Sequence, residues 1–164
     1  MKCVRAVILT CCAAIGLSSS VAAQDVSRPA TSPEVFRVDD SGTVVVDPVL
    51  EMRWQEPGRA GSTSLVSAAT RVSVQLNLAA WVGRSGRIYM VLPRTAGPSV
   101  RATWRTGGTL LPGSLISGDR TLVYAGAINS SFLRDMIEIE LQADGARLAR
   151  PESLAFAFEI EVDQ

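Results

Sequence analysis

The side chains that most often carry out catalysis are missing from most of this chain. There is no histidine, the single lysine is Lys2, and all three cysteines lie among the first 12 residues. Serine hydrolysis through a histidine base, thiol catalysis, Schiff-base chemistry and zinc sites built from nitrogen or sulfur are therefore not available to the rest of the chain. No phosphate-binding GxxxxGK[ST] or GxGxxG motif occurs either. An enzyme would have to work with carboxylates alone, as glycosidases do.

Two pairs of glutamates have a spacing that such chemistry could use. Glu138 and Glu140 lie two positions apart, as do Glu159 and Glu161, so each pair projects from one face of a strand. Close carboxylates can raise the pKa of one member and make it an acid. The water-facing side of an antiparallel strand normally carries the same residues, and we interpret both pairs as surface charges. Arginines on neighbouring strands would complement them, and the candidates are Arg71, Arg101 and Arg105.

Acidic residues near one predicted turn could offer oxygen ligands to calcium. Asp39, Asp40 and Asp47 are close in sequence, but they lack the spacing of a known calcium loop, and acidic turns are common. Asn129 begins a formal glycosylation sequon, a pattern too frequent to carry weight. We therefore predict no catalytic residue, no metal and no cofactor.

The three tryptophans could form a platform on which a ligand stacks. They are Trp54, Trp81 and Trp104. Around Trp104, apolar and polar residues alternate, and this pattern favours core packing over ligand binding.

The N-terminus has the three-part layout of a cleavable secretory signal. Lys2 and Arg5 are followed by an apolar run and then by small residues up to Ala23, so we predict cleavage between Ala23 and Gln24. The apolar run is too short to span a bilayer, which needs roughly 20 apolar residues. We expect an extracytoplasmic protein, in the periplasm, at the cell surface or secreted, with no membrane span after cleavage.

Composition predicts one domain after the signal. Residues 24–33 are polar and contain two prolines, which indicates a flexible lead-in, and residues 34–164 suit a single domain. After removal of Lys2 and Arg5, 14 basic residues remain against 16 acidic ones, a net charge of −2. We therefore expect no nucleic-acid partner.

From Glu34 onward, short apolar runs alternate with turn residues, which predicts an all-β chain. The predicted strands cover residues 35–38, 43–46, 49–54, 71–78, 87–92, 100–105, 109–116, 121–125, 137–142 and 154–162. Of these, residues 87–92 are nearly all apolar and predict a central strand. The run 109–116 is interrupted by Pro112-Gly113.

The segments between these strands carry turn, loop and helix signals. Asp39-Asp40-Ser41-Gly42 and Asp144-Gly145 are typical of hairpin turns. Residues 57–70 predict a long loop, and Ser130–Asp135 a short helix capped by Ser130 or Ser131.

Eight to ten short antiparallel strands with regular turn signals predict a single immunoglobulin-like β-sandwich. A small β-barrel is the alternative. The layout of signal, lead-in and sandwich is similar to that of secreted pilus subunits, although no motif is shared.

Our leading hypothesis is a non-enzymatic exported protein that acts by protein–protein contact, as a subunit or accessory of a pilus-like surface assembly. Such sandwiches often assemble by adding a strand to an open edge, and our candidate segments are the lead-in followed by residues 35–38, and the final strand. A periplasmic binding domain for a sugar or other small polar ligand is the alternative. A carboxylate-only glycosidase is the third hypothesis.

Overall fold

A computed structural model describes residues 34–54, 64–94, 99–147 and 155–163. All of them belong to the second of two units into which the chain divides, Ser32–Gln164. The predicted signal peptide and cleavage site, and the lead-in of residues 24–33, lie outside the described residues.

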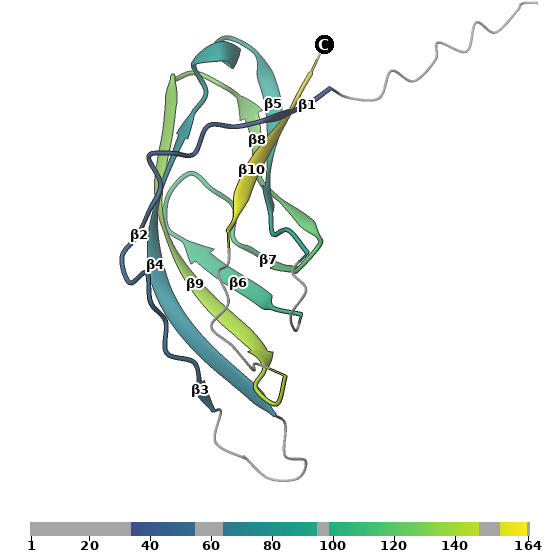
Figure 1. Ribbon diagram of the computed structural model, residues 1–164. Helices are drawn as coiled ribbons and strands as arrows, with labels where there is room; N and C mark the ends of the chain where they lie inside the picture. Colours follow the sequence, from purple (N-terminus) through teal and green to yellow (C-terminus); the bar gives the residue numbers. More distant parts are fainter. Residues whose placement is uncertain (1–33, 55–63, 95–98, 148–154, 164) are drawn as a thin grey trace, which may run out of the picture. The chain divides into compact units, whose positions relative to one another are not determined.

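The described chain is all-β and forms two antiparallel sheets, consistent with the predicted β-sandwich (Figure 1). The four-stranded sheet has the order β1 (Val35–Arg37), β10 (Ala157–Val162), β5 (Ser85–Val91) and β8 (Arg120–Ala127). The six-stranded sheet has the order β2 (Val44–Val45), β4 (Leu65–Asn77), β9 (Phe132–Asp144), β6 (Arg101–Thr106) and β7 (Gly113–Ile116), with β3 (Arg53–Trp54) also paired to β4. A short 3-10 helix, η1 (Ala79–Trp81), connects β4 to β5. The sheets do not close into a barrel within the described ranges.

The core lies between the two sheets and follows the predicted alternation. Side chains of β4, β6 and β9 on one side meet side chains of β5 and β10 on the other in one apolar cluster. Among the least exposed of the large side chains are Trp104, Leu76, Ile88, Met90, Ile137 and Ile160. Burying a side chain of this size contributes roughly 1.5–3 kcal/mol. The predicted central strand is confirmed, because β5 lies between β10 and β8.

The Pro112-Gly113 interruption precedes a close contact in the core. Gly113 begins β7 directly opposite Trp104, and a Cβ at Gly113 would lie 2.8 Å from the indole ring. The buried indole N–H donates a 2.9 Å hydrogen bond to the Leu111 carbonyl. Trp104 is therefore a core residue, as its pattern predicted. Because Gly113 has no side chain, it leaves room for the indole ring.

The turn at Asp39–Gly42 joins two sheets, so the predicted hairpin is wrong. The chain before the turn pairs with β10, whereas β2 after it pairs with β4. At the crossing, Val38 N–H donates to Phe158 O, and Asn77 N–H donates to Asp39 O. Turn chemistry sets a reversal locally, but tertiary packing decides which strand the chain meets next.

The predicted helix at Ser130–Asp135 and part of the predicted loop at 57–70 are also wrong. β4 and β9 each have 13 residues and pair along their whole length, from Leu65 opposite Asp144 to Asn77 opposite Phe132. The pairing supplies partners for backbone groups that a short helix would have satisfied internally. Residues 55–63 lie outside the described chain.

Two further boundaries differ from the prediction. Asp144-Gly145 turns the chain, but β9 does not form a hairpin with β10, because β10 pairs with β1 and β5 in the other sheet. The predicted strand at Val49–Trp54 is reduced to β3.

Candidate functional site

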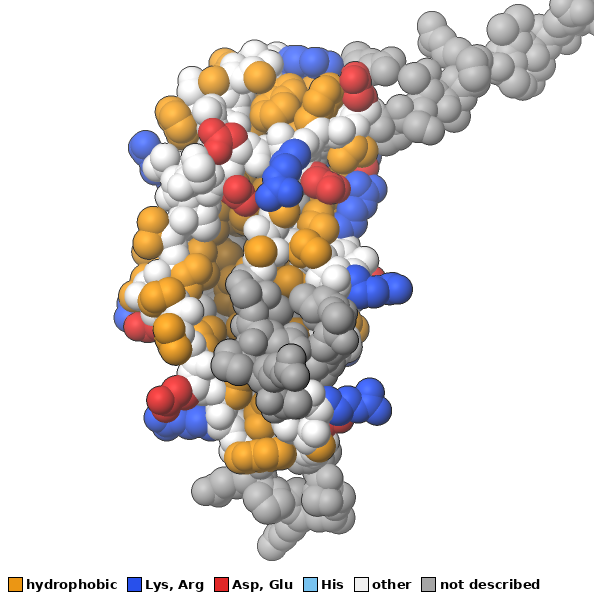
Figure 2. Space-filling view, viewed as in Figure 1, with side chains coloured by type: hydrophobic (Ala, Val, Ile, Leu, Met, Phe, Trp, Pro, Cys, Tyr) orange, Lys and Arg blue, Asp and Glu red, His pale blue; other side chains and the backbone are white. Residues whose placement is uncertain are grey.

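Exposed apolar side chains concentrate along one edge of the six-stranded sheet. We call this set the edge strip, and its members are Val44, Val45, Val46, Val49 and Trp54. It holds five of the ten large apolar side chains that are exposed in the described chain, within a segment of 11 residues. Figure 2 shows hydrophobic side chains along the side where β2 and β3 lie in Figure 1. Such a concentration is typical of an interaction surface.

The outer face of the sheet continues this apolar surface. Val44 lies opposite Ser73 on β4, and Ser73 lies opposite Met136 on β9. Val44 and Met136 are 59% and 50% exposed, so apolar side chains flank the small Ser73. The surface therefore extends from the edge onto the sheet.

The edge of β4 beneath the strip is only partly paired. β2 pairs with Val72 and Ser73, β3 pairs with Val66 and Ser67, and no described strand pairs with residues 68–70 on this side. Between β2 and β3 the chain contains Pro48, which has no N–H to donate to a ladder. A short stretch of β4 backbone is left open as a result.

The direction of the open backbone groups follows from their neighbours. Asn77 N–H bonds to Asp39 O, Gln75 N–H bonds to the Thr43 hydroxyl, and Arg71 O accepts from Val46 N–H. Backbone groups alternate in direction along a strand, so those of Ala69 also point to this edge.

A groove lies between the strip and the open stretch of β4. Its volume is about 510 Å³, and its described lining runs over residues 47–53 and 67–69, with Glu140 beside them. Three acidic side chains, Asp47, Glu51 and Glu140, line it, against the single basic side chain of Arg53. The groove therefore combines an open strand edge with negative charge.

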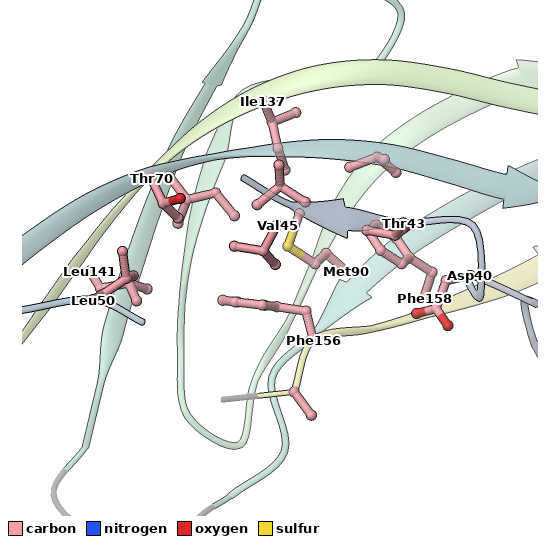
Figure 3. Close-up of a pocket in the computed structure, with 14 residues that line it drawn as sticks. Asp40, Thr43, Val45, Leu50, Thr70, Met90, Ile137, Leu141, Phe156 and Phe158 are labelled. Carbon is pink, nitrogen blue, oxygen red and sulfur yellow. The ribbon is translucent and has the colours of Figure 1, made fainter. Parts of the chain in front are cut away.

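A second hollow lies inside the sandwich. Its volume is about 300 Å³, and β4 and β9 form one wall while Met90, Phe156 and Phe158 form the opposite wall. Val45 and Leu50, from the strip and the segment next to it, close the side (Figure 3). Only three described residues in the lining are polar, and they are Asp40, Thr43 and Thr70.

The predicted glutamate pair Glu159 and Glu161 lies on the outer face of the four-stranded sheet, but Glu161 is not a surface charge. It is 5% exposed, accepts a 2.8 Å hydrogen bond from Arg120 and a 3.1 Å hydrogen bond from the Tyr89 hydroxyl, and lies 3.8 Å from Arg87. The Arg120 guanidinium lies 4.4 Å from the centre of the Tyr89 ring, which supports it between β8 and β10. The expectation that Glu161 faces water is therefore wrong.

Charge pairing outweighs burial in setting the protonation of Glu161. Burial by itself raises the pKa of this carboxyl, but the hydrogen bonds from Arg120 and Tyr89 and the two guanidinium charges bring the pKa below its usual value. Burial and the neighbouring Glu161 carboxylate raise the pKa of Tyr89. Glu161 stays ionised near neutral pH and has no proton to give as a general acid.

The other pair, Glu138 and Glu140, lies on the outer face of the six-stranded sheet and is exposed, as predicted. Glu138 is directly opposite Arg71 on β4 and Arg105 on β6, while Arg101 lies opposite Gln142 instead. The described side chains here form no ion pair within 4.0 Å. The two glutamate pairs are thus on different sheets and do not share a cleft.

The candidate calcium ligands do not converge. Asp39 accepts a hydrogen bond from Ser41 N–H, Asp40 lines the internal hollow, and Asp47 lines the groove. The Ser41 hydrogen bonds lower the pKa of Asp39. Within the described ranges, no three acidic, histidine or cysteine side chains are grouped to hold a metal ion.

The tryptophans and the sequon are likewise separate. Trp104 is in the core, Trp81 packs against Phe36 with ring centres 6.0 Å apart, and Trp54 is 63% exposed in the edge strip. They do not form one platform. Asn129 is exposed in the connection between β8 and β9.

The two segments predicted to mediate strand addition differ in availability. Residues 35–37 form β1, an edge strand already paired to β10 of the same chain, and β10 has a partner on both sides. The β4 edge was missed by sequence reasoning. Its signal was the unbroken apolar run Val44-Val45-Val46, because a strand without alternation exposes apolar side chains on one face.

No protein-family model, curated protein or solved structure matches the chain. Among the described residues there is no helix long and apolar enough to cross a membrane.

Proposed function

We propose that this chain is a non-enzymatic, exported β-sandwich that binds another extracytoplasmic protein by accepting an extended segment along the edge of β4. The observation that carries the proposal is the groove beside Ala69, where open backbone groups lie next to the apolar edge strip. An exposed strand edge is a template for pairing with another chain. A pilus-like surface assembly is one setting in which such pairing builds a polymer.

We propose further that the sandwich is of immunoglobulin-like type. In support, the chain passes between the two sheets from β4 to β5, from β5 to β6 and from β9 to β10. Connections of this kind are typical of that type of sandwich.

The chemistry of the groove specifies the partner segment. Main-chain hydrogen bonds to β4 require an extended strand, and the exposed valines of the strip favour apolar side chains on it. Asp47, Glu51 and Glu140 outnumber Arg53, so a basic side chain in the segment gains complementary charge. The partner is therefore an extended apolar segment that carries lysine or arginine.

Selection from a displayed library of random peptides tests the proposal, with residues 24–164 as the immobilised protein. We expect the selected peptides to combine apolar with basic residues and to protect residues 65–73 against amide hydrogen exchange. Ala69→Pro removes the N–H that faces the groove and leaves the ladder to β9 untouched, so peptide affinity falls at least about tenfold.

Ala69→Thr is the matched control, because it keeps the N–H at the same position. Thermal unfolding of both variants confirms that they fold. Peptides that bind Ala69→Pro as tightly as the parent, or that protect a different strand, would contradict strand addition at β4.

A second candidate function, binding of a sugar or other small polar ligand, rests on a different feature. A depression of about 570 Å³ on the outer face of the six-stranded sheet is lined by Arg71, Glu138, Arg105 and Thr103. Charged and hydroxyl groups around an open depression suit a polar ligand. A thermal-shift screen in which a ligand stabilises the parent but not Arg105→Gln would support it.

The carboxylate-only glycosidase has the least support. Its two carboxyl groups should flank one cleft, about 5–10 Å apart, with one of them protonated. The glutamate pairs lie on different sheets, and the pKa of Glu161 is lowered.

A further inference from the structure

The hollow inside the sandwich has the dimensions of a ligand site. Its volume of about 300 Å³ is roughly twice that of an apolar cavity known to take benzene, and it reaches the lower end of the range for ligand pockets. It is also long. Thr70 lines it, as does Thr43 next to Gln75, and five residues of β4 span about 17 Å at a strand rise of about 3.3 Å per residue. A space of this shape suits a linear chain better than a ring.

Thr70 introduces a hydroxyl into an apolar wall, and among the described residues its only hydrogen bond is a long one. The residue is 8% exposed and shares the inner face of β4 with Val72 and Val74. Its hydroxyl makes one contact with a described residue, 3.4 Å to the neighbouring Arg71 carbonyl, which is long for a hydroxyl donor. A buried hydroxyl without a good partner destabilises the folded state, because it has lost its hydrogen bonds to water. An oxygen acceptor on a bound molecule would satisfy it.

Asp40 introduces a charge at the other end of the hollow. Figure 3 shows Asp40 beside Thr43 and Phe158, well separated in the view from Thr70. Thr43 already exchanges hydrogen bonds with the backbone of Gln75. No described residue donates a hydrogen bond or offers a cation to the Asp40 carboxylate. A carboxylate beside an apolar channel favours a cationic group and opposes an anionic one.

From these features we infer that the hollow binds a linear aliphatic molecule with a protonated amine at the Asp40 end and an oxygen acceptor near Thr70. The body of the chain lies between β4 and β9 on one side and Met90, Phe156 and Phe158 on the other. This site is separate from the groove at Ala69, although Leu50 lines both. It does not depend on the proposed strand addition.

The probes are four ten-carbon compounds: 10-aminodecan-1-ol, decylamine, decan-1-ol and decanoate. Calorimetry on residues 24–164 measures affinity, and the ¹³C-methyl resonances of the methionines locate the site. We expect 10-aminodecan-1-ol to bind most tightly and decanoate most weakly. Met90 lines the hollow and should shift, whereas Met136 is 50% exposed on the outer face and should not.

Two variants test the two ends of the molecule separately. Asp40→Asn should weaken the binding of both amines about tenfold and leave that of decan-1-ol unchanged, while Asp119→Asn, the same charge change at an exposed residue that lines neither the hollow nor the groove, should have no effect. Thr70→Val keeps the shape and should remove the advantage of 10-aminodecan-1-ol over decylamine, about fivefold.

The inference fails if the Met90 resonance is unmoved by all four compounds at millimolar concentration. It also fails if decanoate binds as tightly as decylamine, or if Asp40→Asn and Asp119→Asn behave alike. Peptide binding at the β4 edge is measured independently with Ala69→Pro, so failure of one proposal leaves the other distinguishable.

Discussion

The outer faces of the two sheets carry the same sequence motif in different environments. Glu138 and Glu140 on β9 are exposed, whereas Glu161 on β10 is buried beneath charged partners and Glu159 beside it is half-buried. Both pairs alternate with isoleucines that face the core. Spacing along a strand therefore fixes the face on which a carboxylate lies, while the neighbouring strands fix its exposure and its pKa.

The difference comes from the side chains that the neighbouring strands place around each glutamate pair. On β5, Arg87 lies directly opposite Glu161, and Tyr89 supplies both a hydroxyl and a ring. Arg120 reaches from β8, two strands away, over that ring to the carboxylate. Glu138 has arginines opposite it on both sides, but among the described residues no aromatic ring holds a guanidinium over it. The guanidinium that does lie over a ring on this sheet belongs to Arg134, 5.4 Å from the centre of the Phe132 ring, and it donates a hydrogen bond to Gln75 and not to a carboxylate.

Exchanging each glutamate for glutamine should produce the largest difference in stability between the two sheets. Glu161→Gln leaves Arg120 and Tyr89 without their charged acceptor, so we expect a loss of about 2–3 kcal/mol in the free energy of unfolding. Glu138→Gln changes an exposed side chain and should stay within about 0.5 kcal/mol. Urea unfolding of both variants at pH 7 measures the difference. Equal losses would show that the Glu161 network adds nothing to an ordinary surface charge.

Exchanging the arginines should have a smaller effect. Arg120 bonds to Glu161, lies 3.9 Å from Glu159 and packs on Tyr89, but its side chain is 45% exposed. We expect Arg120→Gln to cost about 1–2 kcal/mol, because Tyr89 and Arg87 continue to serve Glu161. Arg105→Gln, opposite Glu138, is the control and should cost less than about 0.5 kcal/mol. A result in which Arg105→Gln costs more would reverse the assignment of the network to the four-stranded sheet.

Removing the Tyr89 hydroxyl should have a smaller effect still. Tyr89→Phe keeps the ring beneath Arg120 and deletes only the hydrogen bond to Glu161, so we expect a loss of about 1 kcal/mol. If the ring is the main support of Arg120, Tyr89→Leu should cost more than Tyr89→Phe. Equal unfolding free energies for the parent and Tyr89→Phe would remove the hydroxyl from the network.

Protonation of Glu161 by acid should lower the free energy of unfolding less than the substitutions above, because a protonated carboxyl still forms hydrogen bonds. The pKa of Glu161 is lowered in the folded chain, so its contribution is complete above its usual value of 4.5 and is lost as the pH falls through the lower folded pKa. Unfolding measured between pH 7 and pH 2 should therefore show a steeper decline below about pH 4.5 in the parent than in Glu161→Gln.

Two aspartates also titrate in the acid range, but their contributions cancel when the parent is compared with Glu161→Gln. Hydrogen bonds from Ser41 and Ser64 lower the pKa of Asp39 and Asp144, respectively, and the parent and Glu161→Gln both keep these hydrogen bonds. Identical pH profiles for the parent and Glu161→Gln would show that the Glu161 carboxyl titrates as it does in the unfolded chain.

The local sequence pattern correctly predicted the strands with regular alternation. It gave wrong predictions where the structure of a segment depends on a strand far away in sequence. The buried faces of β4, β6, β9 and β10 agree with the period-2 pattern, because alternation has a direct physical cause in the pleat. The turn at Asp39–Gly42 was predicted, but its role as a crossing between sheets depends on β10 and β4, which are far away in sequence. The same reason explains the error at Ser130–Asp135.

Less of the candidate site than of the fold could be predicted from the sequence. The apolar run at residues 44–46 was assigned to a strand, and its exposure follows from the two-residue length of β2 and from Pro48. The groove at Ala69 and the hollow next to Thr70 are made by segments that only pairing brings together.

The all-β class, the inward faces of the long strands and the lack of histidine, cysteine and lysine side chains after residue 23 can all be read from the amino-acid sequence. These properties depend on residue identity and on near neighbours along the chain. Which strands share a sheet, which glutamate is buried and where an edge stays open become visible in the folded chain. Those properties depend on contacts between segments that lie many residues apart, and no local sequence pattern specifies the energy of such contacts.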